Sequence, residues 1–98
     1  MTQEELHKLS FENEEKLLLS DRCGCFSCGR IFNPKEIKEW IKDRNGRTAI
    51  CPYCGIDSVL QEASNGEYIL DEKLLKEMNQ TWFNGSGFEA TIECENTK

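Results

Sequence analysis

Apolar residues along the chain fall into short periodic stretches, which predict several small elements rather than one long helix. Near the amino terminus, Thr2 and Glu5 form a capping-box pattern ahead of Leu6, and a second helical stretch is expected over residues 14–19. The polar segment 10–13 leaves open whether these are one helix or two.

The strongest helix signal lies between the residues numbered 33 and 46. Asn33 and Glu36 make a second capping box, with Pro34 at the first helical position. Three apolar residues then share one helical face: Ile37, Trp40 and Ile41. Because Asn45-Gly46 is suited to the positive φ of a helix end, we expect an amphipathic helix over residues 34–44.

The second half of the chain predicts two further strands, a helix and a terminal strand. Residues 47–50 form a short strand pattern and residues 56–60 an extended segment, while Asp71 begins a helix that residues 84–87 end. The apolar side of that helix comprises Leu74, Leu75, Met78 and Trp82. Strict alternation over residues 88–95 predicts a half-buried antiparallel strand.

Length and composition indicate one small domain in a reducing compartment. The 98 residues are 38% hydrophobic and 31% charged, so the chain buries too little apolar surface to be stable without help. No apolar run approaches the roughly 20 residues of a spanning helix, and the acidic amino terminus has no secretory h-region. We therefore expect a cytoplasmic protein with reduced thiols.

The cysteines supply the clearest chemistry in the chain. The chain has two C-x-x-C-G steps, residues 25–29 and residues 51–55, and 22 residues lie between Cys28 and Cys51. Two such pairs can surround one borderline-soft cation as a tetrahedron of thiolates, which closes its coordination shell. The sequence therefore predicts one structural Zn²⁺ ion. Its predicted ligands are Cys25, Cys28, Cys51 and Cys54.

These features together predict a small α+β module of the zinc-ribbon or treble-clef-like type. It would hold two zinc knuckles, an amphipathic helix between them, flanking helices and a short antiparallel sheet. Its single domain, 1–98, would divide into an N-terminal helical segment at 1–22, a zinc-knuckle core at 23–60 and a C-terminal helix and strand at 61–98.

Several other residues with chemical potential have simpler structural explanations. Cys23, two residues before Cys25, could replace Cys25 as a ligand or lie near the metal as a redox-active thiol, but a packed turn cysteine is the simpler interpretation. Cys94 lies on the apolar face of the terminal strand pattern, and His7 is an isolated histidine among charged residues. Both tryptophans are expected in the core.

Two redox alternatives use the same cysteines. Cys51-Pro52-Tyr53-Cys54 has the spacing of a glutaredoxin dithiol, but that fold needs the motif near its beginning and a long βαβ-type segment after it. Rubredoxins hold one iron between similar knuckles, and the sequence does not distinguish iron from zinc. The predicted helix between the knuckles favours the structural zinc site over an electron carrier.

Several runs resemble a group of small bacterial proteins described only as cytoplasmic. The similar runs are residues 23–28, 32–41, 51–59 and 68–83, and the resemblance covers most of residues 7–83. It implies a bacterial cytosolic zinc module and carries no activity.

Charge separates two non-enzymatic hypotheses for function. The net charge of −6 and the closed metal site favour a protein-interaction or adaptor module. Residues 22–48 nevertheless carry seven Lys or Arg against three Asp or Glu, which would allow nucleic-acid binding through the basic helix. Its cations would be Arg30, Lys35, Lys38, Lys42, Arg44 and Arg47. No persuasive set of nucleophile, base or open metal position predicts an enzyme, and Asp57-Ser58 is explained by a polar turn beside the metal site.

Overall fold

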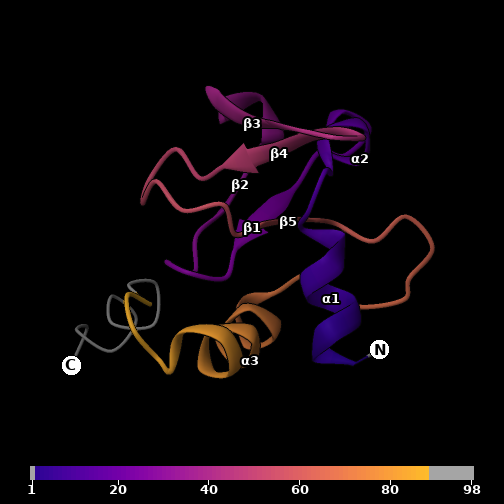
Figure 1. Ribbon diagram of the computed structural model, residues 1–98. Helices are drawn as coiled ribbons and strands as arrows, with labels where there is room; N and C mark the ends of the chain where they lie inside the picture. Colours follow the sequence, from indigo (N-terminus) through magenta and orange to yellow (C-terminus); the bar gives the residue numbers. More distant parts are fainter. Residues whose placement is uncertain (1, 89–98) are drawn as a thin grey trace.

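The computed structural model describes residues 2–88 and combines helices with two short antiparallel sheets (Figure 1). The elements are α1 (Gln3–Leu9), α2 (Glu14–Leu18), β1 (Cys23–Cys25), β2 (Ile31–Phe32), the 3-10 turn η1 (Pro34–Glu36), β3 (Glu39–Asp43), β4 (Gly46–Ile50), β5 (Val59–Gln61) and α3 (Glu72–Phe83). The α+β class predicted from the sequence is confirmed. The terminal strand predicted over residues 88–95 lies outside the described residues apart from Phe88.

The strands form one sheet of three strands and one hairpin. Strand β1 lies between β2 and β5, with Cys23 opposite Phe32 on one side and Gln61 on the other. Strands β3 and β4 pair only with each other, joined by a two-residue loop after Asp43. The hairpin lies above the three-stranded sheet in Figure 1, with β3 outermost.

The amino-terminal region forms two helices because the backbone turns sharply between them. Thr2 caps α1 through a hydrogen bond from the Glu5 N–H, 3.1 Å long, and its own N–H donates to the Glu5 carboxylate, 2.8 Å away. Glu12 then takes a φ of 50°, a left-handed conformation that interrupts a right-handed helix. Helix α2 starts two residues later, at Glu14.

Helix α3 begins and ends where the sequence predicts. The Asp71 carboxylate accepts a 2.9 Å hydrogen bond from the Leu74 N–H, which satisfies a free donor of the first turn. Asn84 ends the helix with a φ of 54°. Among the described residues, no helix has the length and apolar character needed to cross a membrane.

The amphipathic helix predicted over residues 34–44 is wrong. Only its first turn is helical, and there Asn33 and Glu36 make the predicted capping box. The chain leaves the helical conformation at Ile37, which has a ψ of 127°, and continues as the strand β3.

Pairing with β4 explains why residues 39–43 form a strand and not a helix. The segment after Gly46 is extended and pairs with β3 residue by residue, so that Trp40 lies opposite Ala49 and packs beside the buried cysteines. Trp and Ile favour strands, and Asn-Gly is a hairpin signal as well as a helix stop. The capping box therefore describes only one turn, and tertiary pairing decides the rest.

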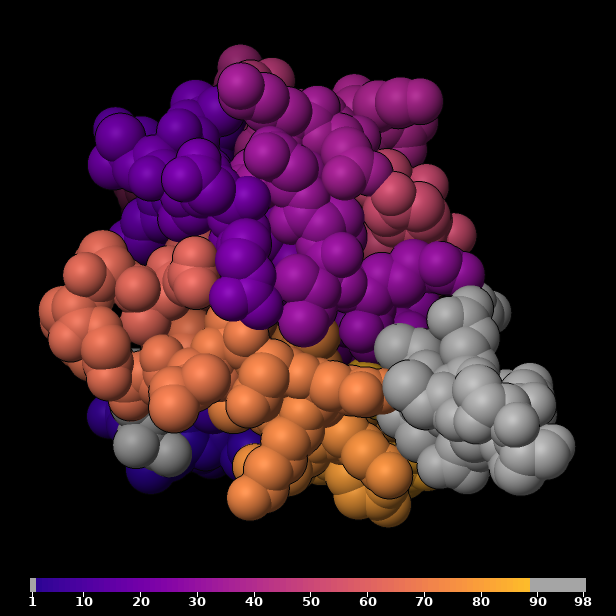
Figure 2. All heavy atoms as spheres, turned by 180° about the vertical axis from the view of Figure 1, so that it is seen from behind, coloured from indigo at the N-terminus to yellow at the C-terminus, as the bar shows by residue number. Residues whose placement is uncertain are grey.

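The three-stranded sheet separates two buried clusters. The cysteine-side cluster comprises Leu17, Cys23, Cys25, Cys28, Phe32, Ile37, Ala49, Cys51 and Val59. The helix-side cluster comprises Leu6, Phe26, Leu60, Leu70, Leu75, Met78 and Phe88. Adjacent residues of β5 face opposite clusters, as the alternation of a strand requires. From behind, residues 10–50 form the upper half and the segment of α3 the lower half (Figure 2).

Gly24 lets α3 approach the helix-side face of the sheet. A Cβ atom on Gly24 would lie 2.8 Å from Cδ1 of Leu75, closer than carbon atoms pack. Its neighbours Cys23 and Cys25 point to the opposite face. Gly24 therefore allows β1 to contact the helix-side cluster on one face, while Cys23 and Cys25 lie in the cysteine-side cluster on the other.

The two tryptophans occupy different environments. Trp40 is half-buried against the cysteine-side cluster, in keeping with the expected core position. Trp82 keeps 36% of its surface exposed, and its ring centroid lies 4.3 Å from that of the exposed His7. The expectation of a core position is therefore wrong for Trp82, because α1 covers it only from one side.

Candidate metal centre

The structure brings the four predicted ligands together at the end of β1, where Cys25 is the last residue of the strand. The Sγ atoms of Cys25, Cys28, Cys51 and Cys54 all lie within 4.8 Å of one another. Cys25 and Cys54 are 3.6 Å apart, and Cys28 and Cys51 are 3.8 Å apart. Four sulfurs about 2.3 Å from one central Zn²⁺ would be about 3.8 Å apart. The cluster therefore has the size of a tetrahedral metal site and can hold a metal ion.

The two knuckles are built by the same backbone hydrogen bonds. In the first knuckle, the Gly29 N–H donates to the Cys25 carbonyl at 2.7 Å and the Cys25 N–H donates to the Arg30 carbonyl at 2.9 Å. In the second, Gly55 donates to the Cys51 carbonyl and Cys51 to Ile56, both at 2.9 Å. The repeated motif in the sequence is thus a repeated loop in space.

Positive φ angles explain why glycine ends each knuckle. Gly29 has a φ of 84° and Gly55 a φ of 79°, a region that side chains disfavour. This turn lets each chain fold back directly after its second cysteine, so both pairs of sulfurs face the same point.

Backbone N–H groups point at all four sulfurs. Ser27 donates to Cys25 at 3.3 Å and Tyr53 donates to Cys51 at 3.4 Å. The second cysteine of each knuckle receives a backbone hydrogen bond from the residue two positions later. These pairs are Arg30 with Cys28, and Ile56 with Cys54. Such donors stabilise thiolates and orient them toward a cation.

Ser58 adds one side-chain partner that the sequence reasoning did not assign. Its hydroxyl lies 3.0 Å from the Cys25 sulfur, and the residue is buried. No local signal in the sequence locates this contact, because it depends on the pairing of β5 with the strand that carries Cys25. Ser58 is therefore a buried hydrogen-bonding neighbour of one sulfur, in the segment that the sequence explains as a polar turn beside the metal site.

The sulfurs share protons when no cation neutralises them. Hydrogen bonds to Cys28, Cys51 and Cys54 raise the pKa of the buried Cys25 thiol. The hydrogen bond from Cys25 lowers the pKa of Cys51 and also lowers the pKa of Cys54, to about 7. A divalent cation favours the thiolate form of all four and so displaces the shared protons.

Cys23 is not part of the four-sulfur cluster. It is fully buried in β1, its sulfur lies 3.5 Å from the Phe32 carbonyl, and burial raises its pKa to about 12. A buried thiol of high pKa is unreactive, as expected for a packing residue. Cys94 lies outside the described residues.

The two knuckles differ in how much they expose to solvent. Phe26 is buried against the helix-side cluster, whereas Tyr53 is 51% exposed. Tyr53 donates a hydrogen bond to Glu36, and the Arg30 guanidinium lies 5.0 Å from its ring. Cys54 is the one exposed cysteine of the cluster. The second knuckle is therefore the accessible side of the centre.

The predicted basic helix face does not exist in the described structure. Arg30 lies against Tyr53 in the second knuckle, and Arg47 pairs with Glu14 of α2. Lys42 and Arg44 lie at the end of the hairpin. Lys35 lies in η1 and Lys38 directly precedes β3, so the six predicted cations do not share one helix face.

The dithiol Cys51-Pro52-Tyr53-Cys54 lacks the structural setting of a glutaredoxin. In the described chain it forms a turn between β4 and β5, and the next helix starts at Glu72. Both sulfurs are instead directed into the four-sulfur cluster.

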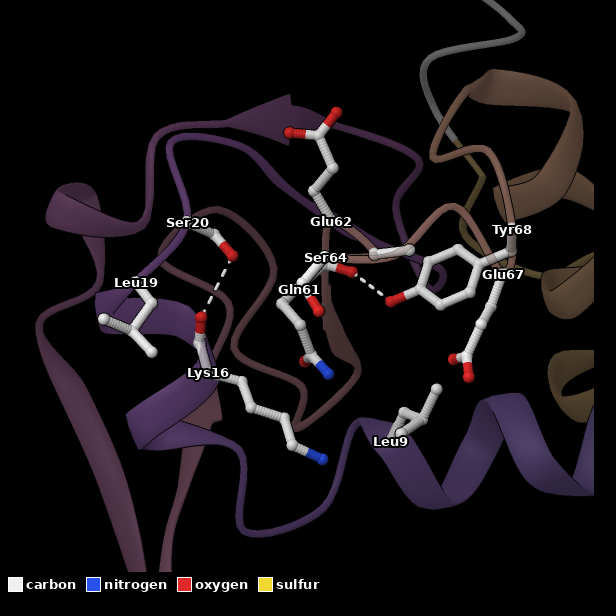
Figure 3. Close-up of a pocket in the computed structure, with 10 residues that line it drawn as sticks. Leu9, Lys16, Leu19, Ser20, Gln61, Glu62, Ser64, Glu67 and Tyr68 are labelled. Carbon is white, nitrogen blue, oxygen red and sulfur yellow. Dashed lines mark hydrogen bonds between the residues drawn. The ribbon is translucent and has the colours of Figure 1, made fainter.

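A separate hollow, lined by residues of α1, of α2 and of the segment around the end of β5, has no cysteine in its wall (Figure 3). Its volume is about 170 Å³, and Lys16 and Glu67 extend toward its opening from opposite sides. Ser20 donates to the Lys16 carbonyl and Tyr68 donates to the Gln61 carbonyl, so these hydroxyls are already engaged. The hollow contains no convergent set of free polar groups that would define a ligand.

No family of proteins, curated protein or solved structure matches this chain in the comparisons. The resemblance to small bacterial proteins accordingly stays a prediction.

Proposed function

We propose that this chain is a small protein with one structural Zn²⁺ ion that acts as a protein-interaction or adaptor module. The observation that carries the proposal is the four-sulfur cluster, whose spacing suits one tetrahedral ion and whose sulfurs all receive backbone hydrogen bonds. Four thiolates fill the coordination shell of zinc, so the ion supports the fold and no step of catalysis is assigned to it.

The surface supports the interaction role. Large apolar side chains are exposed at several places, the most exposed being Leu19 at 89%, with Ile69 and Leu18 next. These exposed apolar side chains are available for contact with another protein. The net charge of −6 disfavours general nucleic-acid binding, and two of the basic residues of that alternative, Arg30 and Arg47, lie against Tyr53 and Glu14.

The metal part of the proposal is tested by the metal content of protein purified without added metal. We expect about one zinc per chain and no visible absorption, whereas iron bound to four thiolates would colour the protein. A chain that is folded and free of metal would contradict the proposal.

The adaptor part is tested by capture from the cells of origin with metal-loaded protein, with and without nuclease. We expect a stoichiometric protein that remains after nuclease treatment. Capture that disappears with nuclease would replace the adaptor function by nucleic-acid binding.

A further inference from the structure

The first knuckle of the metal centre is covered by the rest of the protein. All of its residues, 25–29, are buried. The Asn79 side chain of α3 donates a 3.1 Å hydrogen bond to the Ser27 carbonyl, and a Cβ atom on Gly87 would lie 3.4 Å from the same oxygen. Helix α3 and the turn after it therefore close this side of the centre against solvent.

The second knuckle is open to solvent at the corresponding positions. Residues 52–55 are all exposed, and a Cβ atom on Gly55 would meet no atom of the described residues within 4 Å, its chain neighbours apart. Cys54 is exposed, whereas the other three cysteines of the cluster keep at most 2% of their surface. A small solute therefore reaches the four-sulfur cluster first at Cys54.

The Cys54 sulfur has a second sulfur close enough to become its bonding partner. The Sγ atom of Cys25 lies 3.6 Å away. Because the S–S bond of a disulfide is about 2.05 Å long, the two sulfurs need to approach by about 1.5 Å to form one. Cys25 is held in β1, paired on both sides, so the exposed loop of the second knuckle supplies this movement.

This arrangement suits a two-electron oxidant better than a reagent that only adds a group to one thiol. An accessible cysteine with a second cysteine beside it is the pattern of a reversibly oxidised thiol pair. The nearby sulfur converts the first oxidation product to a disulfide before it is oxidised further. Cys23 has no such setting, because it is fully buried and lies outside the cluster.

We propose that Cys54 is the site at which a peroxide oxidises the metal centre, and that the oxidised Cys54 forms a disulfide with Cys25 and thereby releases the Zn²⁺ ion. The modification makes metal occupancy, and with it the arrangement of the exposed second knuckle, dependent on oxidants. This inference rests on the metal part of the proposed function and adds a modification site to it.

The reaction has two steps. In the first, the Cys54 thiolate attacks one oxygen of hydrogen peroxide, the O–O bond breaks, and a sulfenic acid and a hydroxide ion form. In the second, the Cys25 thiolate attacks the sulfenic sulfur, the S–O bond breaks, and a disulfide and another hydroxide form. The two sulfurs lose two electrons to the peroxide, and two protons from solvent convert the hydroxides to water. The two remaining thiolates fill only half of a tetrahedral shell, so the ion leaves.

The test is oxidation of the zinc-loaded full-length protein by one equivalent of hydrogen peroxide in a Cys94→Ala background. The substitution removes the one cysteine outside the described residues, so every modified thiol has a known position. We expect one Zn²⁺ released to a chromogenic chelator for each disulfide formed. A dithiol reductant followed by added Zn²⁺ should restore one ion per chain, because a disulfide is reversible and a sulfinic acid is not.

Mass spectrometry identifies the sulfurs that react. Chymotrypsin cuts after Phe26 and after Tyr53 and so separates the two cysteines of each knuckle. We expect the disulfide to join Cys25 to Cys54. A 1,3-diketone added with the peroxide traps the sulfenic acid, and its adduct on Cys54 should exceed that on any other cysteine by at least about tenfold.

Cys23→Ala is the matched control variant. Cys23 shares a chymotryptic fragment with Cys25 but lies outside the four-sulfur cluster. The variant should therefore release zinc at an unchanged rate and give the same disulfide, now without ambiguity about which cysteine of that fragment carries it.

Three results would overturn the inference. They are zinc retained after the peroxide is consumed, a sulfenic acid adduct on Cys28 or Cys51 as abundant as that on Cys54, and a disulfide that leaves out Cys25. A folded protein purified without metal would contradict the proposed function itself and the release step with it. A zinc protein that reacts at another sulfur contradicts this inference alone, and a failed capture of a protein partner affects only the adaptor part.

Discussion

On one face of the β2-β1-β5 sheet, Cys23 and Cys25 point into the cluster that surrounds the candidate metal centre, whereas on the other face Gly24 lies against Leu75 of α3. Three buried cysteines of the cysteine-side cluster, Cys25, Cys28 and Cys51, contribute sulfurs to the group of four that can hold a metal ion. The helix side is closed by leucine, methionine and phenylalanine alone. With the proposed Zn²⁺ bound, the two faces of the sheet would have different sources of stability, metal coordination on one face and apolar burial on the other.

The largest expected effect on stability comes from removing one predicted metal ligand. Cys51→Ser should abolish metal binding, because structural zinc contributes about 10–16 kcal/mol apparent at neutral pH and three thiolates hold it poorly. Metal content and thermal unfolding measure the change, and we expect no bound zinc and no cooperative transition.

Cys23→Ala is the matched control for that variant. Cys23 is equally buried but lies outside the four-sulfur cluster, so the variant should keep one zinc per chain. Full metal content in Cys51→Ser, or its loss in Cys23→Ala, would show that the ligands are assigned wrongly.

The second-largest expected effect on stability comes from shortening a buried side chain of the helix-side cluster. Leu75→Ala should lower the free energy of unfolding by about 2–5 kcal/mol, since the side chain is fully buried against the sheet. Chemical denaturation measures it, with Leu74→Ala as the control, because Leu74 is only partly buried. Metal content should stay at one ion. If Leu75→Ala also lost the metal at low denaturant, the two sides would form a single cooperative unit.

A smaller effect is expected from the hydroxyl group beside the metal centre. Ser58→Ala removes the hydrogen bond to the Cys25 sulfur and should weaken metal affinity about 10- to 100-fold. Competition with a chelator measures this affinity. Ser58→Thr keeps a hydroxyl and should restore most of it, whereas Ser64→Ala on the exposed loop should have no effect. Equal affinities in all three variants would remove Ser58 from the centre.

The smallest effect concerns the start of α3. Asp71→Ala removes the N-cap hydrogen bond to Leu74 and should cost about 1 kcal/mol of stability without altering metal affinity. Denaturation is the measurement, and Asp21→Ala, an exposed aspartate outside any helix, is the control. A change in metal affinity as large as that of Ser58→Ala would mean that α3 supports the metal centre directly.

Sequence patterns predicted the structure correctly where the conformation depends on one short segment alone. The spacing of the cysteines and the glycine after each pair predict the two knuckles, and both loops form with those glycines at positive φ. The cap residues of α1 and α3 likewise act on their own first turn. The ligand assignment and the identity of the metal stay predictions.

The features that the sequence did not predict depend on contacts between segments far apart in the chain. Strands β3 and β4 form a hairpin where a helix was predicted, because each strand is stabilised by pairing with the other. The apolar spacing at Ile37, Trp40 and Ile41 is compatible with a helix or with a strand. The contact of Ser58 with Cys25 and that of Gly24 with Leu75 join segments more than 30 residues apart. No local pattern in the sequence indicates such pairs.

The symmetry of the knuckles has a consequence for how the chain can change in length. Both ends of the segment from Arg30 to Ile50 are fixed, since each enters or leaves a knuckle that a bound ion would clamp. Insertions at the Arg44–Asn45 loop would lengthen the hairpin outward without moving either pair of sulfurs. The β3–β4 hairpin is thus the part of this protein that can be redesigned, extended or exchanged while the two pairs of sulfurs keep their positions.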